Sequence, residues 1–190
     1  MKRLLFNLLR LLLLSALGGA AWVAHRAETL PELPAAAKPR EQDVLEELRL
    51  AAIKRATAFE ISEADINRHL AAVMPTRIGS RAEGWFRLQD TRVELEEGRA
   101  HVVIVWDVRG LRRTASIDLT IRREAENYHV EVLHGAIGHL RLPRGMMRVL
   151  DPTLRVITDA LDAEIKALFQ MTQISFGKDK LLLDSRFTSA

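Results

Sequence analysis

The sequence contains no cysteine and few aromatic residues, and its first 26 residues include no acidic residue. Without cysteine, the chain cannot form a disulfide, a thiolate metal site or a cysteine nucleophile, and it cannot carry a lipid on an N-terminal cysteine. Aromatic residues make up 5% of the chain, too few for the stacking platforms of proteins that bind single-stranded nucleic acid. The folded part must therefore be held together by its hydrophobic core.

The net charge of +3 comes from the N-terminal segment. Lys2, Arg3, Arg10 and Arg26 are four of the 28 basic residues, so the rest of the chain carries 24 basic against 25 acidic residues. A nucleic-acid-binding domain would show a basic excess of its own, and none remains here. We therefore expect no nucleic-acid partner.

The segment from Leu4 to Ala24 is apolar, with Asn7 and Arg10 as its clearly polar residues. At a rise of about 1.5 Å per residue, such a helix is roughly 30 Å long and can cross a bilayer. We predict a transmembrane anchor over residues 1–26 in the inner (cytoplasmic) membrane. Its basic end would lie in the cytoplasm and the following domain in the periplasm or extracellular space. The alternative is a cleaved signal peptide, with residues 35–37 (Ala-Ala-Ala) as the candidate cleavage site.

Two further regions follow the predicted anchor. Pro31, Pro34 and Pro39 indicate an extended linker over residues 27–40. The remaining residues, 41–190, are enough for a single domain with its own core.

The predicted domain begins with two helices. Apolar residues at helical spacing predict the first over residues 41–59. Ser62 and Asp65 have the spacing of a capping box and predict the start of the second, which we expect to end before Pro75.

A period of two in hydrophobicity predicts four strands, over residues 85–95, 100–108, 114–121 and 128–137. Short turns between them indicate an antiparallel meander. Apolar residues on both sides of the second strand require that both of its faces be covered. A Met-rich turn at 143–147, a long amphipathic helix over 152–169 and a hairpin of 173–176 with 181–184 follow. The fold class is therefore α+β, a curved antiparallel meander wrapped on amphipathic helices.

Two short motifs resemble those of a known family. Residues 61–70, Ile-Ser-Glu-Ala-Asp-Ile-Asn-Arg-His-Leu, resemble the I-S-E-x-E-L-N-x-x-L opening of small bacterial envelope proteins of the YpmS-like and YceB-like types. Residues 138–143 resemble their G-x-L-x-L-P turn, and the order of elements is similar.

The resemblance covers roughly residues 42–187. It implies a fold like one half of the tubular lipid-binding (TULIP-like) proteins, whose bent sheet wraps a long helix beside an apolar groove. It implies no catalytic residues. The YceB-like members are lipoproteins, whereas this chain lacks the cysteine.

We predict an apolar binding site between the sheet and the helix over 152–169. Its expected lining combines the second face of the strand over 100–108, the paired methionines and the helix, namely Val103, Val105, Met146, Met147, Ile157, Leu161 and Ile165. Thioether side chains adapt to varied ligands, although core packing is their more common role. A lipid or another apolar molecule would be the ligand.

Other classes of site have weaker support in the sequence. His101, His129 and Glu131 would form a divalent metal site if one face of the sheet brought them together. Isolated histidines on strands are more often solvated, so we expect no metal, no cofactor and no catalysis. The alternative function is a membrane-tethered domain that binds another envelope protein or acts as a scaffold.

Overall fold

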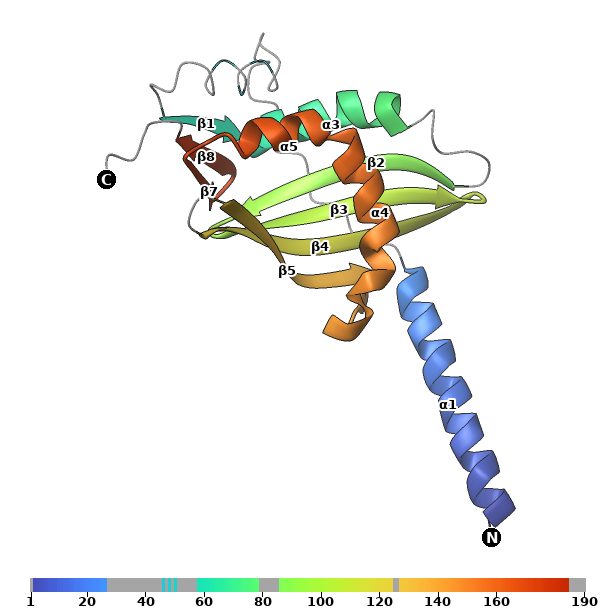
Figure 1. The fold of residues 1–190 in the computed structure, drawn as a ribbon. Helices are drawn as coiled ribbons and strands as arrows, with labels where there is room; N and C mark the ends of the chain where they lie inside the picture. Colours follow the sequence, from blue (N-terminus) through green and yellow to red (C-terminus); the bar gives the residue numbers. More distant parts are fainter. Residues whose placement is uncertain are drawn as a thin grey trace.

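A computed structural model describes residues 2–26, 46, 48, 50, 58–78, 86–124 and 127–184 (Figure 1). The predicted linker over 27–40 lies outside the described residues. The elements, in chain order, are α1 (Lys2–His25), β1 (Ala58–Ser62), α3 (Glu63–Ile78), β2 (Phe86–Glu96), β3 (Arg99–Val108), β4 (Leu111–Glu124), β5 (Asn127–Ile137), β6 (Leu140–Arg141), the 3-10 helix η1 (Arg144–Leu150), α4 (Asp151–Ala160), α5 (Asp162–Leu168), β7 (Gln173–Gly177) and β8 (Lys180–Asp184).

Helix α1 extends away from the sheets (Figure 1). Within the described chain it is the one helix long and apolar enough to span a membrane, over Phe6–Ala24. At its C-terminal end the guanidinium carbon of Arg26 lies 5.3 Å from the centroid of the Trp22 ring. Amphipathic aromatic and basic side chains are typical of the boundary between membrane and water.

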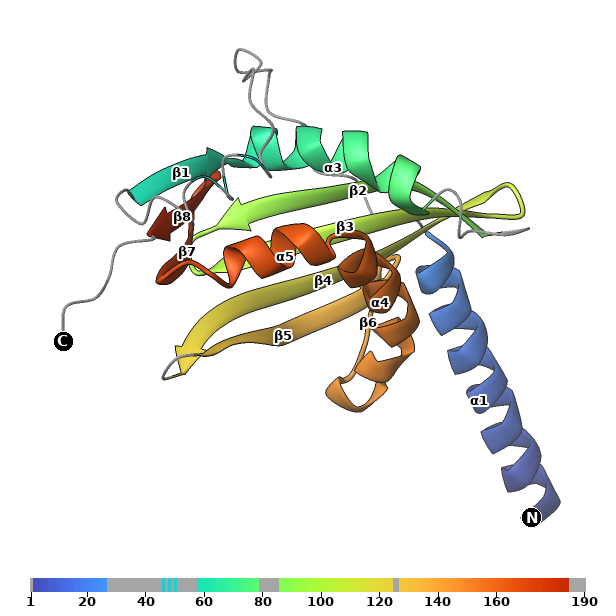
Figure 2. The same ribbon diagram turned by 45° about the horizontal axis from the view of Figure 1, so that its top comes forward.

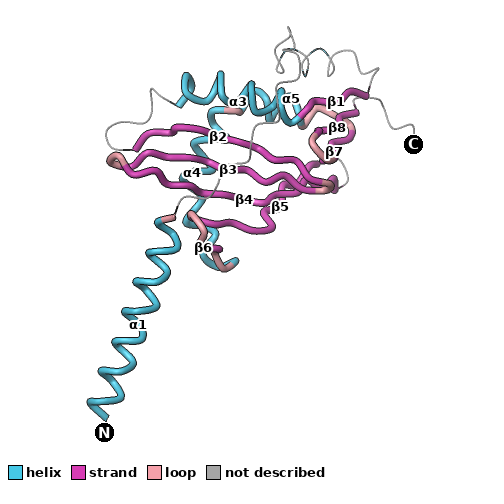
Figure 3. Tube along the Cα trace, turned by 180° about the vertical axis from the view of Figure 1, so that it is seen from behind, coloured by secondary structure: helices cyan, strands magenta, loops and turns pink. Residues whose placement is uncertain are grey.

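The four predicted strands form an antiparallel meander in the order β2-β3-β4-β5, and β6 adds a short fifth strand. The prediction is confirmed closely for β2, β3 and β5, whereas β4 extends beyond the predicted 114–121 at both ends. Helices α3, α4 and α5 lie on one face of this sheet, which we call the inner face (Figures 2 and 3). The α+β class is confirmed.

The predicted capping box opens α3. The N–H of Asp65 donates to Ser62 Oγ at 3.1 Å, and the Ser62 hydroxyl donates to the Asp65 carboxylate at 2.6 Å. The predicted end before Pro75 is wrong, because α3 continues to Ile78. Met74 and Ile78 are buried in the core, and this packing outweighs the backbone hydrogen bond that proline removes.

Two side chains of α3 bind the edge of β2. Asn67 Nδ2 donates to the carbonyl of Val93, and Asn67 Oδ1 accepts from the N–H of Val93, both at 2.7 Å. One turn earlier, Glu63 Oε2 accepts from the N–H of Leu95 at 2.7 Å. We call these contacts the edge clamp. They satisfy backbone groups that an edge strand otherwise leaves unpaired.

The closing hairpin, β7 and β8, is confirmed, but it forms a separate sheet of order β1-β8-β7. The predicted helix over 41–59 extends too far, because Ala58 and Phe59 belong to β1 and pair with β8. Apolar and polar residues alternate in β1, and Ile61 is buried opposite Leu181. Positions 46, 48 and 50 are helical, while the rest of 41–57 lies outside the described residues.

The long helix predicted over 152–169 is interrupted. Leu161 has φ −105° and ψ 17°, and α4 ends before it while α5 begins after it. The carbonyl of Ala160 accepts a hydrogen bond of 2.6 Å from Arg77 of α3 at this point. After this change of direction, Glu164 of α5 forms hydrogen bonds with His69 and Arg77 of α3. The turn predicted at 143–147 is not a separate turn, because Pro143 caps η1 and residues 144–147 form its first part.

Both faces of β3 are buried, which confirms the prediction for this strand. Ile104 and Trp106 are buried on the inner face, in a cluster with residues of α3 and α4. Val103 and Val105, on the outer face, are each 0% exposed. Leu48 is also buried, in a second cluster that includes β1 and β8.

The C-terminal end of α1 contacts the turn between β5 and β6. The N–H of His139 donates to the carbonyl of Val23 at 3.3 Å. Gly138 has φ +55°, and a Cβ at this position would lie 2.6 Å from the carbonyl oxygen of Ala24. Both the conformation and the close approach require glycine here.

We expect Asn67→Ala to lower the free energy of unfolding by about 2 kcal/mol, because the N–H and C=O of Val93 lose their partners. Urea denaturation of the full-length protein in mild detergent measures this. Thr76→Ala, at an exposed position of the same helix, is the control and should change stability by less than about 0.5 kcal/mol. Equal effects of the two substitutions would contradict the edge clamp.

Candidate functional site

The inner face is filled over β3. Ile104 and Trp106 pack with Leu70 of α3 and Ile157 of α4, and Leu161 packs against the same cluster. Side chains of the protein therefore occupy the space between β3 and α4, where the sequence analysis placed a ligand. A site on this face must lie elsewhere.

The structure does not bring the predicted site residues together. Ile157 and Leu161 lie on the inner face over β3. Val103 and Val105 alternate with Ile104 and therefore point to the outer face, on the far side of the sheet. These four residues cannot contact one ligand.

The remaining predicted residues lie on three elements. Met147 of η1 packs over β5, with its sulfur 3.0 Å from the position that a Cβ on Gly135 would occupy. Met146 is exposed on η1, and Ile165 is half-buried on α5. The two methionines thus have different environments, one against the sheet and one in contact with solvent.

The inner face is open over part of β5. Val130 pairs with Ile121 and Val132 with Leu119, and Ile121 and Leu119 pack against the inner core. The two valines are nevertheless 49% and 38% exposed. We call Val130 and Val132, with the neighbouring Ile121, the inner β5 surface.

Covered regions border the inner β5 surface at both ends. Met147 and Leu150 of η1 lie over Gly135 at one end. At the other end, the Tyr128 ring stacks on Phe169 with 5.9 Å between centroids, and Phe169 is itself 42% exposed. An apolar surface therefore lies between η1 and the end of α5.

The edge of β5 that faces away from β4 is also largely without a paired strand. β6 pairs with Ala136 and Ile137, and the carbonyl of Gly135 accepts from the N–H of Leu142. Between residues 128 and 134, no strand of the described chain pairs with this edge. Its backbone groups are available to an additional strand.

The outer face carries a polar cluster that the sequence analysis missed. The Asp118 carboxylate lies between two histidines, 2.6 Å from His101 Nδ1 and 3.8 Å from His134 Nδ1. The three residues come from β3, β4 and β5. Only the strand register brings them together, so no local pattern identifies them.

The hypothetical metal ligands do not converge. His129 lies 3.7 Å from Glu124, Glu131 lies 3.4 Å from Arg122, and His101 is bonded to Asp118. Among the described residues, no group of three His, Asp or Glu side chains has the arrangement of a metal site.

A buried ionic network joins α3 to α5. Glu164 Oε1 lies 2.9 Å from His69 Nε2, and Glu164 Oε2 accepts from Arg77 at 2.9 Å. Burial of Glu164 raises its pKa, but the hydrogen bonds from Arg77 and His69 outweigh this, and the pKa lies below its ordinary value. The pKa of Glu63 lies above its ordinary value, because burial raises it more than the hydrogen bond from the Leu95 N–H lowers it. The carboxylate of Glu164 is held in its charged form to fix α5.

A pocket of about 280 Å³ lies on the small sheet, away from the inner β5 surface. Its lining comes from β1, β7 and β8 and is partly polar, and comprises Ala58, Phe59, Glu60, Gln173, Ser175, Leu182, Leu183 and Asp184. It contains none of the predicted site residues. Its lining mixes apolar and polar side chains, whereas the inner β5 surface consists of Val130, Val132 and Ile121.

Residues Val130, Val132 and Phe169 were not among the predicted site residues. Val130 and Val132 alternate with His129 and Glu131, so the sequence does show that they share a face. It does not show that the helices leave this part of the face open.

We expect Glu164→Gln to lower stability at pH 7 by about 2 kcal/mol, because Arg77 and His69 lose a charged partner. A carboxyl with a lowered pKa in the folded state stabilises the fold above its unfolded pKa, and this contribution is lost as the pH falls through the folded pKa. Unfolding titrations should therefore show a smaller loss of stability in the variant as the pH falls below the ordinary pKa of a glutamate.

Glu63→Gln is the matched control for this prediction. Its raised pKa means that the charged form is penalised as the pH rises, so the amide should not lower stability at pH 7 and can still accept from Leu95. The same loss of acid sensitivity in both variants would contradict the role assigned to Glu164.

Comparison with known proteins gives no family for the chain. No protein-family model and no curated protein sequence matches it.

Proposed function

We propose that this chain is a membrane-anchored protein of the cell envelope that binds a lipid or another apolar ligand without catalysis. Helix α1 is the anchor, and the inner β5 surface holds the apolar part of the ligand. The observation that carries the proposal is the exposure of Val130 and Val132, 49% and 38%, on the face of the sheet that otherwise forms the core.

The apolar character and the position of this surface suit an acyl chain. Removing one methylene from water contributes about 0.8 kcal/mol, so an acyl chain over Val130, Val132 and Phe169 needs no charged contact to bind. Gly135 allows Met147 to approach β5 closely, and this adaptable side chain forms one border. Partial cover by η1 and α5 would shield the rest of the chain.

The position of β5 also supports the entry of a lipid from a bilayer to the inner β5 surface. The strands follow one another from β2 to β5 toward the side on which α1 extends (Figures 1 and 3). With α1 across a membrane, β5 is the strand of the meander nearest that membrane. Lys2, Arg3 and Arg10 favour a cytoplasmic N-terminus and a periplasmic domain.

The resemblance to YpmS-like and YceB-like proteins agrees with this proposal. The motif over 61–70 supplies the capping box and the edge clamp, and the motif over 138–143 supplies the turn that contacts α1. The resemblance implies a bent sheet that wraps one long helix, and here α4 and α5, separated at Leu161, stand in the place of that helix. These features support a lipid-handling role over a catalytic one.

The second candidate function is a membrane-tethered domain that binds another envelope protein. The free edge of β5 between residues 128 and 134 favours it, because an extended peptide can add to such an edge as a further strand. The two functions use different parts of the same strand, the inner face for a lipid and the edge for a peptide.

A photoreactive amino acid at position 132 tests the proposal in native membranes. We expect ultraviolet light to yield lipid adducts, identified by mass spectrometry of the full-length protein. Adding Val130→Gln should reduce their yield about fivefold, because roughly 1 kcal/mol of apolar contact is lost.

The same photoreactive residue at position 131 is the control, since Glu131 is on the outer face of β5, beside Arg122. It should give few lipid adducts. Protein adducts at both positions, with no lipid at position 132, would reject the lipid function and support the interaction domain.

The proposed topology gives a separate prediction. A reporter that is active only in the periplasm should be active when fused after Ala190, and the untagged protein should sediment with membranes at its full 21.4 kDa. A soluble form that begins near Lys38 would show that the N-terminal segment is a cleaved signal peptide.

A further inference from the structure

The contact between α1 and the β5–β6 turn fixes the level of this turn relative to a membrane. Trp22 and Arg26 mark the end of the apolar part of α1. The carbonyl of Val23, between them, accepts from the N–H of His139. If α1 spans a bilayer, as the proposed function requires, the turn lies at the boundary between headgroups and water.

The segment that follows this turn is basic. Residues 138–150 include Arg141, Arg144 and Arg148 and no acidic residue, and Asp151 is the first acid after them. The three arginines are exposed. None forms an ion pair with another described residue, whereas Arg92, Arg99 and Arg122 of the meander do.

One side of helix η1 packs against β5, and another side is exposed to solvent. A 3-10 helix has about three residues per turn, so residues three apart lie on the same side. Met147 and Leu150 share one side and pack over Gly135 of β5. Met146 and Val149 share another side, and they are 53% and 56% exposed.

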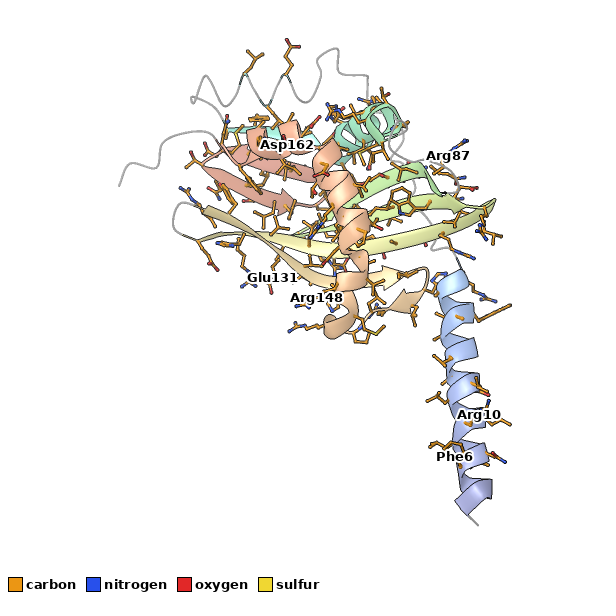
Figure 4. All side chains as sticks on the ribbon, turned by 45° about the vertical axis from the view of Figure 1, so that its right-hand side comes forward. Phe6, Arg10, Arg87, Glu131, Arg148 and Asp162 are labelled. Carbon is orange, nitrogen blue, oxygen red and sulfur yellow. The ribbon has the colours of Figure 1, made fainter. Side chains whose placement is uncertain are left out.

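Helix η1 is also on the membrane side of the domain. In Figures 1 and 2, the short turn that precedes α4 projects toward the side on which α1 extends. In Figure 4, Arg148 lies on this side of the sheet, whereas Arg87 of β2 lies on the opposite side.

We infer that η1 is a second membrane contact, which binds the surface of a bilayer that contains anionic lipids. Met146 and Val149 enter the boundary between headgroups and acyl chains, and Arg141, Arg144 and Arg148 bind lipid phosphates. Exposed apolar side chains beside unpaired basic ones are typical of segments that lie in this boundary. The inference depends on the anchoring that we propose for α1, and it would place the inner β5 surface where a lipid can reach it.

The test uses the full-length protein in vesicles of phosphatidylethanolamine with phosphatidylglycerol, and in vesicles of phosphatidylcholine. Because the chain has no cysteine, Met146→Cys provides a unique site for an environment-sensitive fluorophore. A membrane-impermeant label restricts the signal to outward-facing domains. Lys178→Cys, in the exposed turn between β7 and β8, is the reference position, and Val149→Cys is a second test position.

In the anionic vesicles, we expect acrylamide to quench the fluorophore at position 146 at least threefold less efficiently than the fluorophore at position 178. Arg144→Gln with Arg148→Gln should abolish this protection, and phosphatidylcholine vesicles should reduce it. Arg87→Gln, at an exposed arginine on the opposite side, should leave it unchanged.

Equal quenching at positions 146, 149 and 178 would overturn the inference, as would protection that does not depend on lipid charge or on the two arginines. Failure of the anchor gives a different result, because the protein would then not float with the vesicles. Loss of lipid adducts at position 132, with protection at position 146 retained, would reject the ligand but leave the membrane contact of η1 in place.

Discussion

The edge clamp between α3 and β2 determines the arrangement of the inner face. Once Asn67 and Glu63 bind the backbone of β2, helical spacing directs Leu70, Met74 and Ile78 toward the core. The same orientation presents His69 and Arg77 to Glu164, so it also decides where α5 lies. A helix held by hydrophobic contact alone could slide along the strand. Hydrogen bonds to two specific residues of β2 fix its register.

The two edges of the meander have opposite properties, and this asymmetry bears on function. At β2, side chains of α3 satisfy backbone groups of Val93 and Leu95 and cover this part of the edge. At β5, the edge between 128 and 134 is free, and the adjoining inner face exposes Val130 and Val132. An exposed, partly apolar edge strand favours association with other chains in a soluble protein. On the side toward α1 such a surface can be shielded by a membrane, by a bound lipid or by a partner.

Local patterns predicted much of the fold but little of the site. The period of two located the four strands of the meander, and the spacing of Ser62 and Asp65 located the start of α3, because both signals depend on neighbouring residues. The break at Leu161 and the inclusion of Phe59 in β1 depend on contacts distant in sequence, and both were missed. The alternation placed Val103 on the opposite face of its strand from Ile104, but it did not show which of the two faces Ile157 covers. Asn67, a polar residue within a helix, would ordinarily be expected in solvent.

The close approach at Gly138 has a mechanical consequence. Because the β5–β6 turn is bonded to the last turn of α1, the domain and the helix rotate together for as long as this contact holds. For the membrane-spanning α1 that we propose, the rotation of α1 about its own axis then sets the direction in which β5 faces. If α1 spans a membrane, as we propose, the same contact holds the domain close to that bilayer. A ligand of the inner β5 surface would then be exchanged with this bilayer or with a neighbouring protein rather than carried to a second membrane.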